Sequence, residues 1–279
     1  MSVAGPPLAD DGVVRGLAER ILGSPVHVEL LKHKEGRRRT TRIRGARGSA
    51  IVKRYASLRA PTVARRVRAL AAGPAEPQVP EVLLLAAPLR LLVLSEVPGA
   101  PLREALLDGD LDACARAGAA LASWHLALAD AVTGDFDAHT IERELATLDS
   151  RAQVADPSIA GAARSIAAEL SAPWECSTVV HRDLYEEQIM LGDRVGLIDL
   201  DDSAIGPPEL DLGNLAAHVE LLAIRSGRSV EPGLEAFLDG YRAVAQRIDD
   251  ALLDRCRRLT RLRLACIHGE GSLLDQAVA

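Results

Sequence analysis

Residues 181–199 of the 279-residue chain read HRDLYEEQIMLGDRVGLID, and this stretch decides the fold class. It carries oxygen donors at set intervals: Asp183 is the third residue, Gln188 follows five positions later, and Asp199 ends the stretch. The apolar residues within 189–198 flank a Gly-Asp turn and predict a short hairpin. Because a loop followed by a hairpin folds back on itself, we expect the three donors to reach one cleft.

These residue types suit the transfer of a phosphoryl group. The reaction needs one carboxylate beside the acceptor hydroxyl and separate oxygen ligands for the magnesium that neutralises the phosphates. Asp183 is the candidate that orients or deprotonates the acceptor, whereas Gln188 and Asp199 are the candidate Mg²⁺ ligands. His181 is predicted to support the loop. Residues 181–188 fit the kinase catalytic-loop pattern H-R-D-L-x-x-x-N except at the last position, where Gln replaces Asn.

The same region resembles the aminoglycoside phosphotransferase and choline kinase family. The family's runs His-Gly-Asp-Leu-His-x-x-Asn, Ile-Asp-Phe-Gly-Asp and Asp-Pro-x-x-Asp-Leu align with residues 181–188, 198–202 and 207–212, and its Leu-x-x-Leu-His and Phe-x-x-Gly-Tyr segments resemble residues 118–125 and 237–242. The resemblance covers most of the chain and is strongest from 178 to 215. It implies an ATP-dependent kinase of small molecules that uses Mg²⁺, with Asp211 bracing the catalytic loop. From the residues alone, Asp211 is equally a helix-entry residue.

The chain departs from the family pattern in four places. Gln188 is one methylene longer than Asn but keeps the carbonyl that ligates metal. Asp201 replaces a glycine, and Pro207 replaces an aspartate. No Asp or Glu lies between residues 54 and 75, so the predicted helix there offers no acid to pair with Lys53. For Lys53 three hypotheses stand: a misplaced helix boundary, Glu76 serving from a loop, or positioning by phosphate alone.

Before residue 96 the sequence predicts a small antiparallel sheet with helices. Helices are expected over 8–22 and 61–72, and strands over 26–31, 37–44, 50–55, 82–85 and 91–94. Lys53 is placed where the family has the strand lysine that pairs nucleotide phosphates. Glu96 and Val97 are placed by position alone as the backbone contacts of adenine. The basic hairpin 32–39 is interpreted as a solvated loop or as a cover over phosphates.

After residue 96 the sequence is overwhelmingly helical apart from the hairpin, with a strong amphipathic stretch over 117–129. We therefore expect an α+β, bilobal, protein-kinase-like fold. Residues 1–95 would form the nucleotide-binding N-lobe, a small antiparallel sheet. Residues 96–279 would form a mostly helical C-lobe with the catalytic loop and the acceptor site.

Composition limits the partners. The net charge of −6 and only seven aromatic residues argue against nucleic acid, which needs a basic footprint and stacking platforms. No apolar run is long enough to span a membrane, and the start MSVAGPPLADD is not typical of a signal peptide, so we expect no membrane partner and a cytoplasmic location. The four cysteines are scattered and predict buried thiols rather than a metal or redox pair. The oligomeric state stays open.

Two rival functions and several acceptors follow from the same residues. A protein kinase is disfavoured because only 12 positions separate Asp199 from Asp211, which leaves no room for an activation segment. A nucleotide-binding regulatory pseudokinase is the alternative, suggested by Gln188 and by the missing acid for Lys53. The acceptor is predicted to be a small hydroxylated molecule such as an aminoglycoside, another antibiotic, an amino alcohol or a sugar. Acidic residues including Glu186, Glu187 and Asp202 favour a cationic acceptor, although Asp202 is also interpreted as a metal ligand or a turn residue.

Overall fold

The computed structural model describes residues 11–129 and 134–278. The chain divides into two compact units. The first comprises the residues up to Ala72 together with Val79–Val97, and the second comprises Gly73–Gln78 and the chain from Pro98 onward. The segment 73–78, which we assigned to the N-lobe from the sequence, therefore packs with the second unit.

The first unit is built on a five-stranded antiparallel sheet. Its elements are α1 (Asp11–Leu22), β1 (His27–Lys34), β2 (Arg38–Gly45), β3 (Gly48–Tyr55), α2 (Ala60–Ala71), β4 (Val82–Ala86), the short 3₁₀ helix η1 (Ala87–Leu89) and β5 (Leu91–Ser95). The strand order is β1-β2-β3-β5-β4, and each neighbouring pair is antiparallel. The predicted meander of three strands with two further strands is confirmed.

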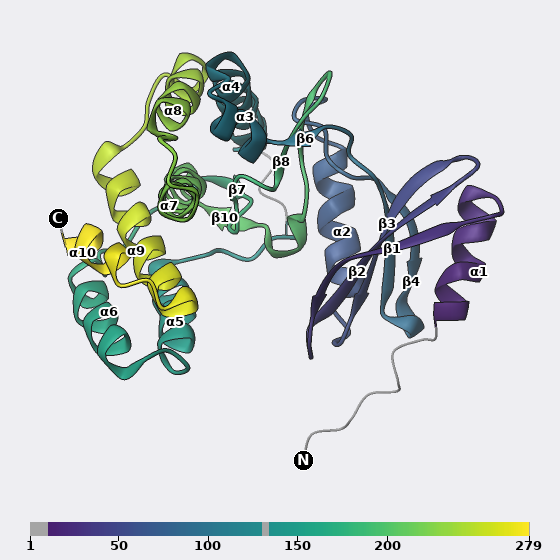
Figure 1. Cartoon of the computed structure of the whole chain (residues 1–279), viewed down its shortest axis with the longest axis horizontal. Helices are drawn as coiled ribbons and strands as arrows, with labels where there is room; N and C mark the ends of the chain where they lie inside the picture. Colours follow the sequence, from purple (N-terminus) through teal and green to yellow (C-terminus); the bar gives the residue numbers. More distant parts are fainter. Residues whose placement is uncertain (1–10, 130–133, 279) are drawn as a thin grey trace. The chain divides into compact units, whose positions relative to one another are not determined.

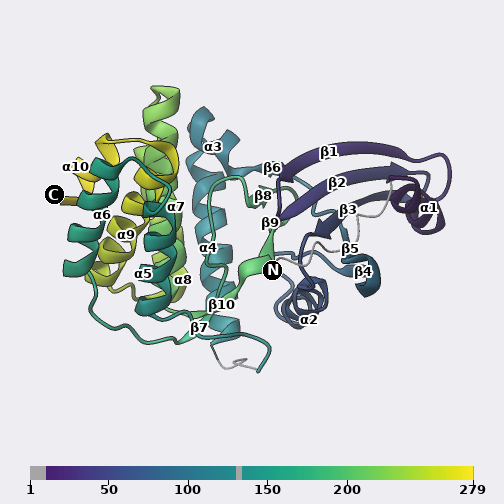
Figure 2. The ribbon, with the colours of Figure 1, turned by 90° about the horizontal axis from the view of Figure 1, so that it is seen from below.

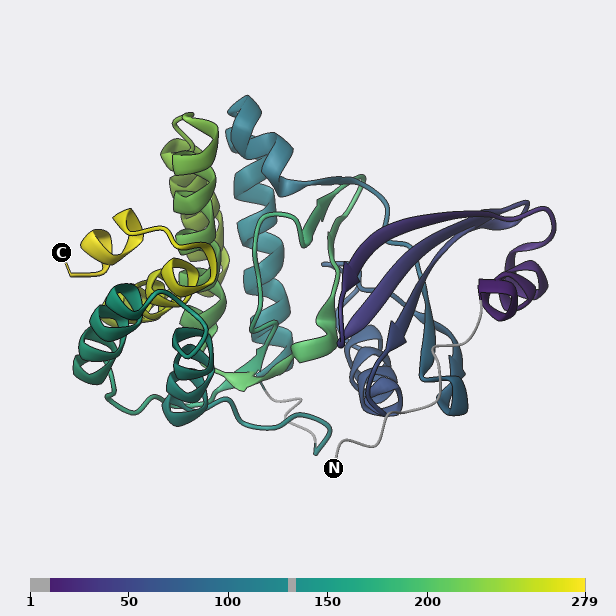
Figure 3. The same ribbon diagram turned by 60° about the horizontal axis from the view of Figure 1, so that its bottom comes forward.

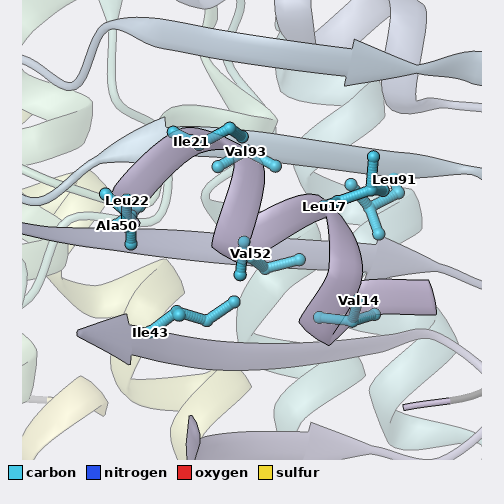
Figure 4. A pocket seen from close by; sticks show the side chains of 10 residues that line it. Val14, Leu17, Ile21, Leu22, Ile43, Ala50, Val52, Leu91 and Val93 are labelled. Carbon is cyan, nitrogen blue, oxygen red and sulfur yellow. The ribbon is translucent and has the colours of Figure 1, made fainter. Parts of the chain in front are cut away.

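The two helices of this unit lie on opposite sides of the sheet (Figure 1). Helix α1 packs its apolar stripe, which includes Val14 and Leu22, against Ile43, Val52 and Val93 of the sheet. Figure 4 shows these side chains lining a small apolar cavity between α1 and the strands. The first part of the helix predicted over 8–22, residues 8–10, lies outside the described residues.

The second unit is mainly helical. Its elements are β6 (Ala100–Pro101), α3 (Leu102–Asp108), α4 (Leu111–Leu128), α5 (Ile141–Ala152), α6 (Pro157–Glu169), β7 (Thr178–Val180), β8 (Ile189–Leu191), β9 (Val195–Leu197), the 3₁₀ helix η2 (Leu200–Asp202), β10 (Ala204–Gly206), α7 (Pro208–Ser226), α8 (Glu231–Ala245), α9 (Asp250–His268) and α10 (Ser272–Val278). Apolar residues of α5, α6 and α9, among them Leu148 and Leu262, form one cluster of its core (Figure 2).

Helices α4 and α8 lie side by side along much of their length (Figure 3). Two glycines allow this close approach. A Cβ atom at Gly118 would overlap the Phe237 carbonyl, and one at Gly240 would overlap the Ala115 carbonyl. Because interiors are close-packed, neither position accepts a side chain without separating the helices.

Two small sheets interrupt the helices and hold the loop between them. Strand β7 pairs with β10, whereas β8 lies between β6 and β9. The predicted hairpin is confirmed, because Ile189 lies opposite Leu197 in an antiparallel pair. Within the same unit, Gln78 pairs with Gly196. The Gln78 N–H donates to the Val195 carbonyl, and the Gln78 carbonyl accepts from the Leu197 N–H. The loop His181–Gln188 therefore runs from one small sheet to the other.

Across the described residues, none of the helices combines the length and the apolar character needed to cross a membrane.

Candidate active site

The loop His181–Gln188 connects β7 to β8, and a turn closes its far end. The Gln188 N–H donates to the Tyr185 carbonyl over 2.9 Å. Asp183 is partly exposed, unlike His181 and Gln188, which are buried. Arg182, immediately before Asp183, has a φ of 72°, in the left-handed region that favours glycine. Asp183 is thus partly open to solvent, while His181 and Gln188 at the two ends of the loop are buried inside the unit.

Asp211 fixes the start of this loop. It lies inside α7 and is fully buried, and its two carboxylate oxygens accept hydrogen bonds from the backbone N–H groups of His181 (2.6 Å) and Arg182 (2.7 Å). His125 Nε2 lies 3.1 Å from the same carboxylate, and His125 Nδ1 lies 2.9 Å from the Tyr241 hydroxyl. Pro207 is the N-cap of α7, and Asp211 stands in the first turn of this helix, so its position at the helix entry and its contacts with the loop go together.

A second buried chain of polar side chains holds the loop through Arg182. Asn214 Nδ2 donates to the Arg182 carbonyl over 2.6 Å, and Asn214 Oδ1 accepts from Arg263. Arg263 also pairs with Glu144 Oε1 at 3.2 Å, while Glu144 Oε2 lies 2.8 Å from His139 Nε2. Burial raises the pKa of Glu144, but Arg263 and His139 outweigh it and hold the pKa at about 2. Glu144 is therefore charged, and helices α5, α7 and α9 meet at this chain.

The hairpin brings Gln188 and Asp199 together. The Ile198 N–H donates to the Gln188 carbonyl over 3.0 Å, and His181 Nε2 donates to the Ile198 carbonyl over 2.8 Å. Asp199, the next residue, has a φ of 62° and is the N-cap residue of the short helix η2. His181, which was predicted to support the loop, thus contacts the Ile198 backbone, which lies between the candidate metal ligands Gln188 and Asp199.

The donor set around Gln188 fits a hard divalent cation. The Gln188 side chain is only 2% exposed, and its Oε1 accepts no hydrogen bond from any group in the described chain. A buried acceptor without a donor is costly unless a ligand satisfies it. Among the described residues no three His, Cys, Asp or Glu side chains are placed to share a metal ion. Mg²⁺ is commonly held by one or two protein oxygens together with phosphate oxygens and water, and Gln188 Oε1 is an oxygen of that kind.

Asp201 and Asp202 follow in the turn of η2. Asp201 is buried at 1% exposure, whereas Asp202 is partly exposed. The Ser203 hydroxyl closes this turn by donating to the Leu200 carbonyl over 3.0 Å. At position 201, where the family has glycine, this chain therefore has a buried carboxylate two residues after Asp199, a candidate metal ligand.

The remaining predicted site residues belong to the first unit. Lys53 is 4% exposed and lies on β3 opposite Thr40 of β2 and Leu92 of β5. Strand alternation places its side chain on the face opposite Val52, which packs against α1. Glu96 and Val97 follow β5, and the Glu96 carboxylate pairs with Arg42 Nε at 2.7 Å. The Glu96 side chain is therefore engaged within the sheet, which leaves its backbone as the candidate adenine contact.

The helix before Glu76 has the predicted extent, so a misplaced boundary does not explain why this helix offers no acid for Lys53. Helix α2 is Ala60–Ala71, and its sequence contains no Asp or Glu. Glu76 Oε1 accepts a hydrogen bond from the Val195 N–H over 3.0 Å, inside the second unit. This contact ties the segment 73–78 to the hairpin that ends at Asp199.

Two further groups lie next to Asp183 in the loop. Glu186 is 8% exposed; burial raises the pKa of its carboxyl to about 7, and the charge of Glu187 adds to the rise. The Tyr185 and His218 rings stack, with centroids 5.0 Å apart and planes at 24°. Burial, with help from nearby positive charges that include Arg263, lowers the pKa of His218 to about 3, so its imidazole is neutral.

Sequence reasoning missed the inner supports of the loop. It gave no supporting role to His125, Asn214, Glu144 or Arg263. For His125 and Tyr241 a signal existed, because both stand in the two helical segments that resemble the family. For Glu144 and Arg263 we find none, since their meeting depends on how α5 and α9 pack.

The chain was compared with known proteins. The model of the phosphotransferase enzyme family matches residues 29–264. No curated protein sequence matches the chain significantly. Among solved structures, an amicoumacin kinase in complex with AMP-PNP, Ca²⁺ and Ami is similar at 17% identity and a TM-score of 0.72, with 96% of this chain and 92% of that chain covered.

Two further structures show the same fold. A choline kinase from Cryptosporidium parvum Iowa II is similar at 10% identity and a TM-score of 0.68, with 95% and 90% of the two chains covered. A spectinomycin phosphotransferase in complex with ADP and spectinomycin is similar at 14% identity and a TM-score of 0.66, with 97% and 90% covered. The predicted α+β, protein-kinase-like fold is confirmed.

With most of its length matched by one family model, and with the loop, hairpin and bracing aspartate that its motifs predict, the chain belongs to the phosphotransferase enzyme family.

Proposed function

We propose that this protein is a small-molecule kinase that moves the γ-phosphoryl group of ATP to a hydroxyl of its acceptor. The observation that carries the proposal is the buried Gln188 Oε1, which accepts no hydrogen bond within the described residues. The Gln188 backbone carbonyl accepts a hydrogen bond from the N–H of Ile198, the neighbour of Asp199, and Gln188 follows Asp183 by five positions. This arrangement supports a metal site and an acceptor base within one loop and hairpin.

The second unit supplies the proposed chemistry at the acceptor. Asp183 orients the acceptor hydroxyl and accepts its proton as the bond to phosphorus forms. Gln188 Oε1 and the Asp199 carboxylate would hold Mg²⁺, which neutralises charge on the transferred phosphoryl group. His181 donates to the Ile198 carbonyl, and Asp211 holds the backbone N–H groups of His181 and Arg182, the two residues before Asp183. Asp202, in the turn after Asp199, is proposed as a supporting residue.

The first unit supplies the proposed nucleotide contacts. Lys53, buried on β3, would pair with the phosphates, and the backbone of Glu96 and Val97 would bind adenine. The amicoumacin kinase and the spectinomycin phosphotransferase were solved with AMP-PNP and ADP, which supports a nucleotide as the donor. Rate enhancement would come mainly from positioning and from electrostatic stabilisation of the phosphoryl group.

The acceptor is proposed to be a small hydroxylated compound such as an aminoglycoside, another antibiotic, an amino alcohol or a sugar. The similar structures include kinases of amicoumacin, choline and spectinomycin, so the fold accommodates unlike acceptors. The family match gives no support to the regulatory pseudokinase, and both catalytic carboxylates are present. A cytoplasmic location remains a prediction.

A matched pair of variants tests the proposal. Asp183→Asn removes the proposed base, whereas Asp193→Asn changes an exposed carboxylate in the hairpin turn ten residues away. A panel of hydroxylated antibiotics, amino alcohols and sugars is incubated with ATP and Mg²⁺, and phosphorylated products are measured by mass spectrometry. We expect transfer by the wild type and by Asp193→Asn, with a loss of about 10²–10⁴-fold in Asp183→Asn.

One result would replace this proposal with the regulatory alternative. If nucleotide binds to the wild type but no compound of the panel is phosphorylated, the protein is a nucleotide-binding pseudokinase rather than an enzyme. Equal transfer by Asp183→Asn and wild type would remove Asp183 from the mechanism.

A further inference from the structure

The face of the sheet opposite Lys53 carries two arginines side by side. Arg39 of β2 lies directly opposite Arg54 of β3 in the antiparallel register. Because side chains alternate along a strand, Arg54 is on the same face as Val52, which packs against α1. Like charges directly opposite each other repel, so this part of the sheet favours an anion nearby.

A cavity of about 260 Å³ lies beside this pair of arginines. Residues from α1, β1, β2 and β3 line it: Val14, Arg15, Val28, Leu30, Arg39, Thr41, Val52 and Arg54. Three of these described residues are arginines, and none of the eight is acidic. Arg54 is only 6% exposed, whereas Arg15 is exposed on α1. The cavity therefore has cations both in its buried wall and at its exposed rim.

The rest of the wall is largely apolar. Val14 and Val52 line this cavity and also the small apolar cavity under α1 that Figure 4 shows. The two cavities therefore share part of a wall. A ligand held at the arginines would thus meet apolar side chains directly beside its charged group.

An irregularity of the sheet lies at the same place. The register of β1 against β2 shifts between Leu30 and Lys32, so one extra residue bulges out of β1. Strand β1 is at the edge of the five-stranded sheet, and Leu30 is 51% exposed although it lines the cavity. Bulges redirect side chains and are frequent next to functional sites. The bulge is an observation independent of the arginines.

We propose that this cavity is a second ligand site, which binds a small organic anion. The planar guanidinium groups of Arg15, Arg39 and Arg54 suit a carboxylate or a phosphate ester, because each offers two parallel N–H donors. The apolar group of the ligand lies against Val14 and Val52. Cavities for drug-sized ligands measure about 300–1,000 Å³, so this ligand is smaller. The site does not depend on the proposed kinase function.

The test measures binding to the full chain by calorimetry, which needs no turnover. Four probes separate the charge from the apolar group. Hexyl phosphate and hexanoate carry both, inorganic phosphate carries only the charge, and hexanol carries only the apolar group. The variants are Arg39→Gln and Arg15→Gln. Their matched controls are Arg37→Gln, exposed in the hairpin turn, and Arg20→Gln, exposed on α1.

We expect hexyl phosphate or hexanoate to bind the wild type at least about tenfold more tightly than inorganic phosphate and hexanol. The tighter of the two identifies the charged group of the ligand. Its affinity should fall about tenfold or more in Arg39→Gln, and less in the exposed Arg15→Gln, because charge-assisted hydrogen bonds are lost. The two controls should stay within about twofold of the wild type. Saturating AMP-PNP with Mg²⁺ should leave the affinity unchanged.

Four results would overturn the inference. The first is no measurable binding of hexyl phosphate and hexanoate to the wild type. The second is binding of inorganic phosphate or hexanol as tight as that of the two combined probes. The third is an affinity that Arg39→Gln leaves unchanged. The last is displacement of the probe by AMP-PNP, which would place it at the nucleotide contacts instead.

Discussion

The inner and outer sides of the loop His181–Gln188 differ in how their polar groups are satisfied. On the inner side, toward α7, Asp211 and Asn214 use their side chains fully on the backbone of His181 and Arg182 and on buried neighbours. On the outer side, Gln188 Oε1 and Glu186 Oε2 are buried but accept no hydrogen bond within the described chain. Satisfied networks stabilise, whereas unsatisfied groups are retained at the expense of stability. Buried polar groups with hydrogen-bond partners are therefore candidates for a role in folding, and those without partners are candidates for ligand binding.

Removal of Asp211 should give the largest effect. Asp211→Ala leaves the buried N–H groups of His181 and Arg182 without an acceptor, at about 1–3 kcal/mol each, so we expect a loss of about 4 kcal/mol in the free energy of unfolding. Urea denaturation measures it. Asp183→Asn serves as the control, because Asp183 lies partly exposed on the outer side. Equal stability of the two variants would show that the inner side of the loop does not stabilise the fold more than the outer side.

The charge of Glu144 should give the next largest effect, and it depends on pH. The folded pKa of about 2 lies below the ordinary value of 4.5, so the native state favours the ionised form. The resulting stabilisation, about 3 kcal/mol, is present above pH 4.5 and is lost as the pH falls toward 2. Glu144→Gln should therefore be less stable at pH 7 and lose less stability on acidification.

Denaturation of Glu144→Gln at several pH values between 7 and 2 tests this expectation. Glu142→Gln, in the exposed first turn of the same helix, is the matched control. Its free energy of unfolding should fall with the pH as that of the wild type does. A Glu144→Gln curve parallel to that of the wild type would show that this carboxylate does not stabilise the inner side.

The outer side should respond through metal affinity rather than stability. Gln188→Met keeps the length of the side chain but has no oxygen, so the Mg²⁺ concentration for half-maximal phosphate transfer should rise about 10–100-fold. Its free energy of unfolding should not fall, because the lost oxygen has no donor among the described residues. Gln188→Asn keeps an amide carbonyl and should stay within a few-fold of the wild type. A lower free energy of unfolding in Gln188→Met would show that Gln188 stabilises the fold, as the residues on the inner side do.

The smallest effect concerns the backbone between the two sides. Arg182 has a φ of 72°, where a Cβ atom is unfavourable by about 1–2 kcal/mol and glycine is not. Arg182→Gly and Arg182→Ala both remove the side chain, so their difference isolates the backbone. After allowing for the flexibility of glycine in the unfolded chain, we expect Arg182→Gly to be the more stable by about 1 kcal/mol. A more stable Arg182→Ala in thermal denaturation would contradict this strain.

The linear motif predicted much of the outer side. Asp183, Gln188 and Asp199 lie within 17 positions, and the structure brings the last two together through the Ile198 backbone. Short apolar runs around a Gly-Asp turn sufficed to predict the hairpin, because local turn chemistry and strand propensity act over a few residues. The inner side was poorly predicted. Glu144 and Arg263 meet across 119 positions, and no periodicity encodes such a pairing.

By itself the sequence determined the fold class, the order of strands and helices in the first unit, and the family motifs, since these depend on patterns that are local along the chain. The tertiary structure decided which polar residues are satisfied. It shows that Asp211 and Asn214 hold the loop from within, and that Gln188 and Glu186 keep buried oxygens without donors in the described residues. The reason is physical: burial and hydrogen bonding depend on helices packed together from distant parts of the chain, and the fate of a polar group follows from its neighbours in space.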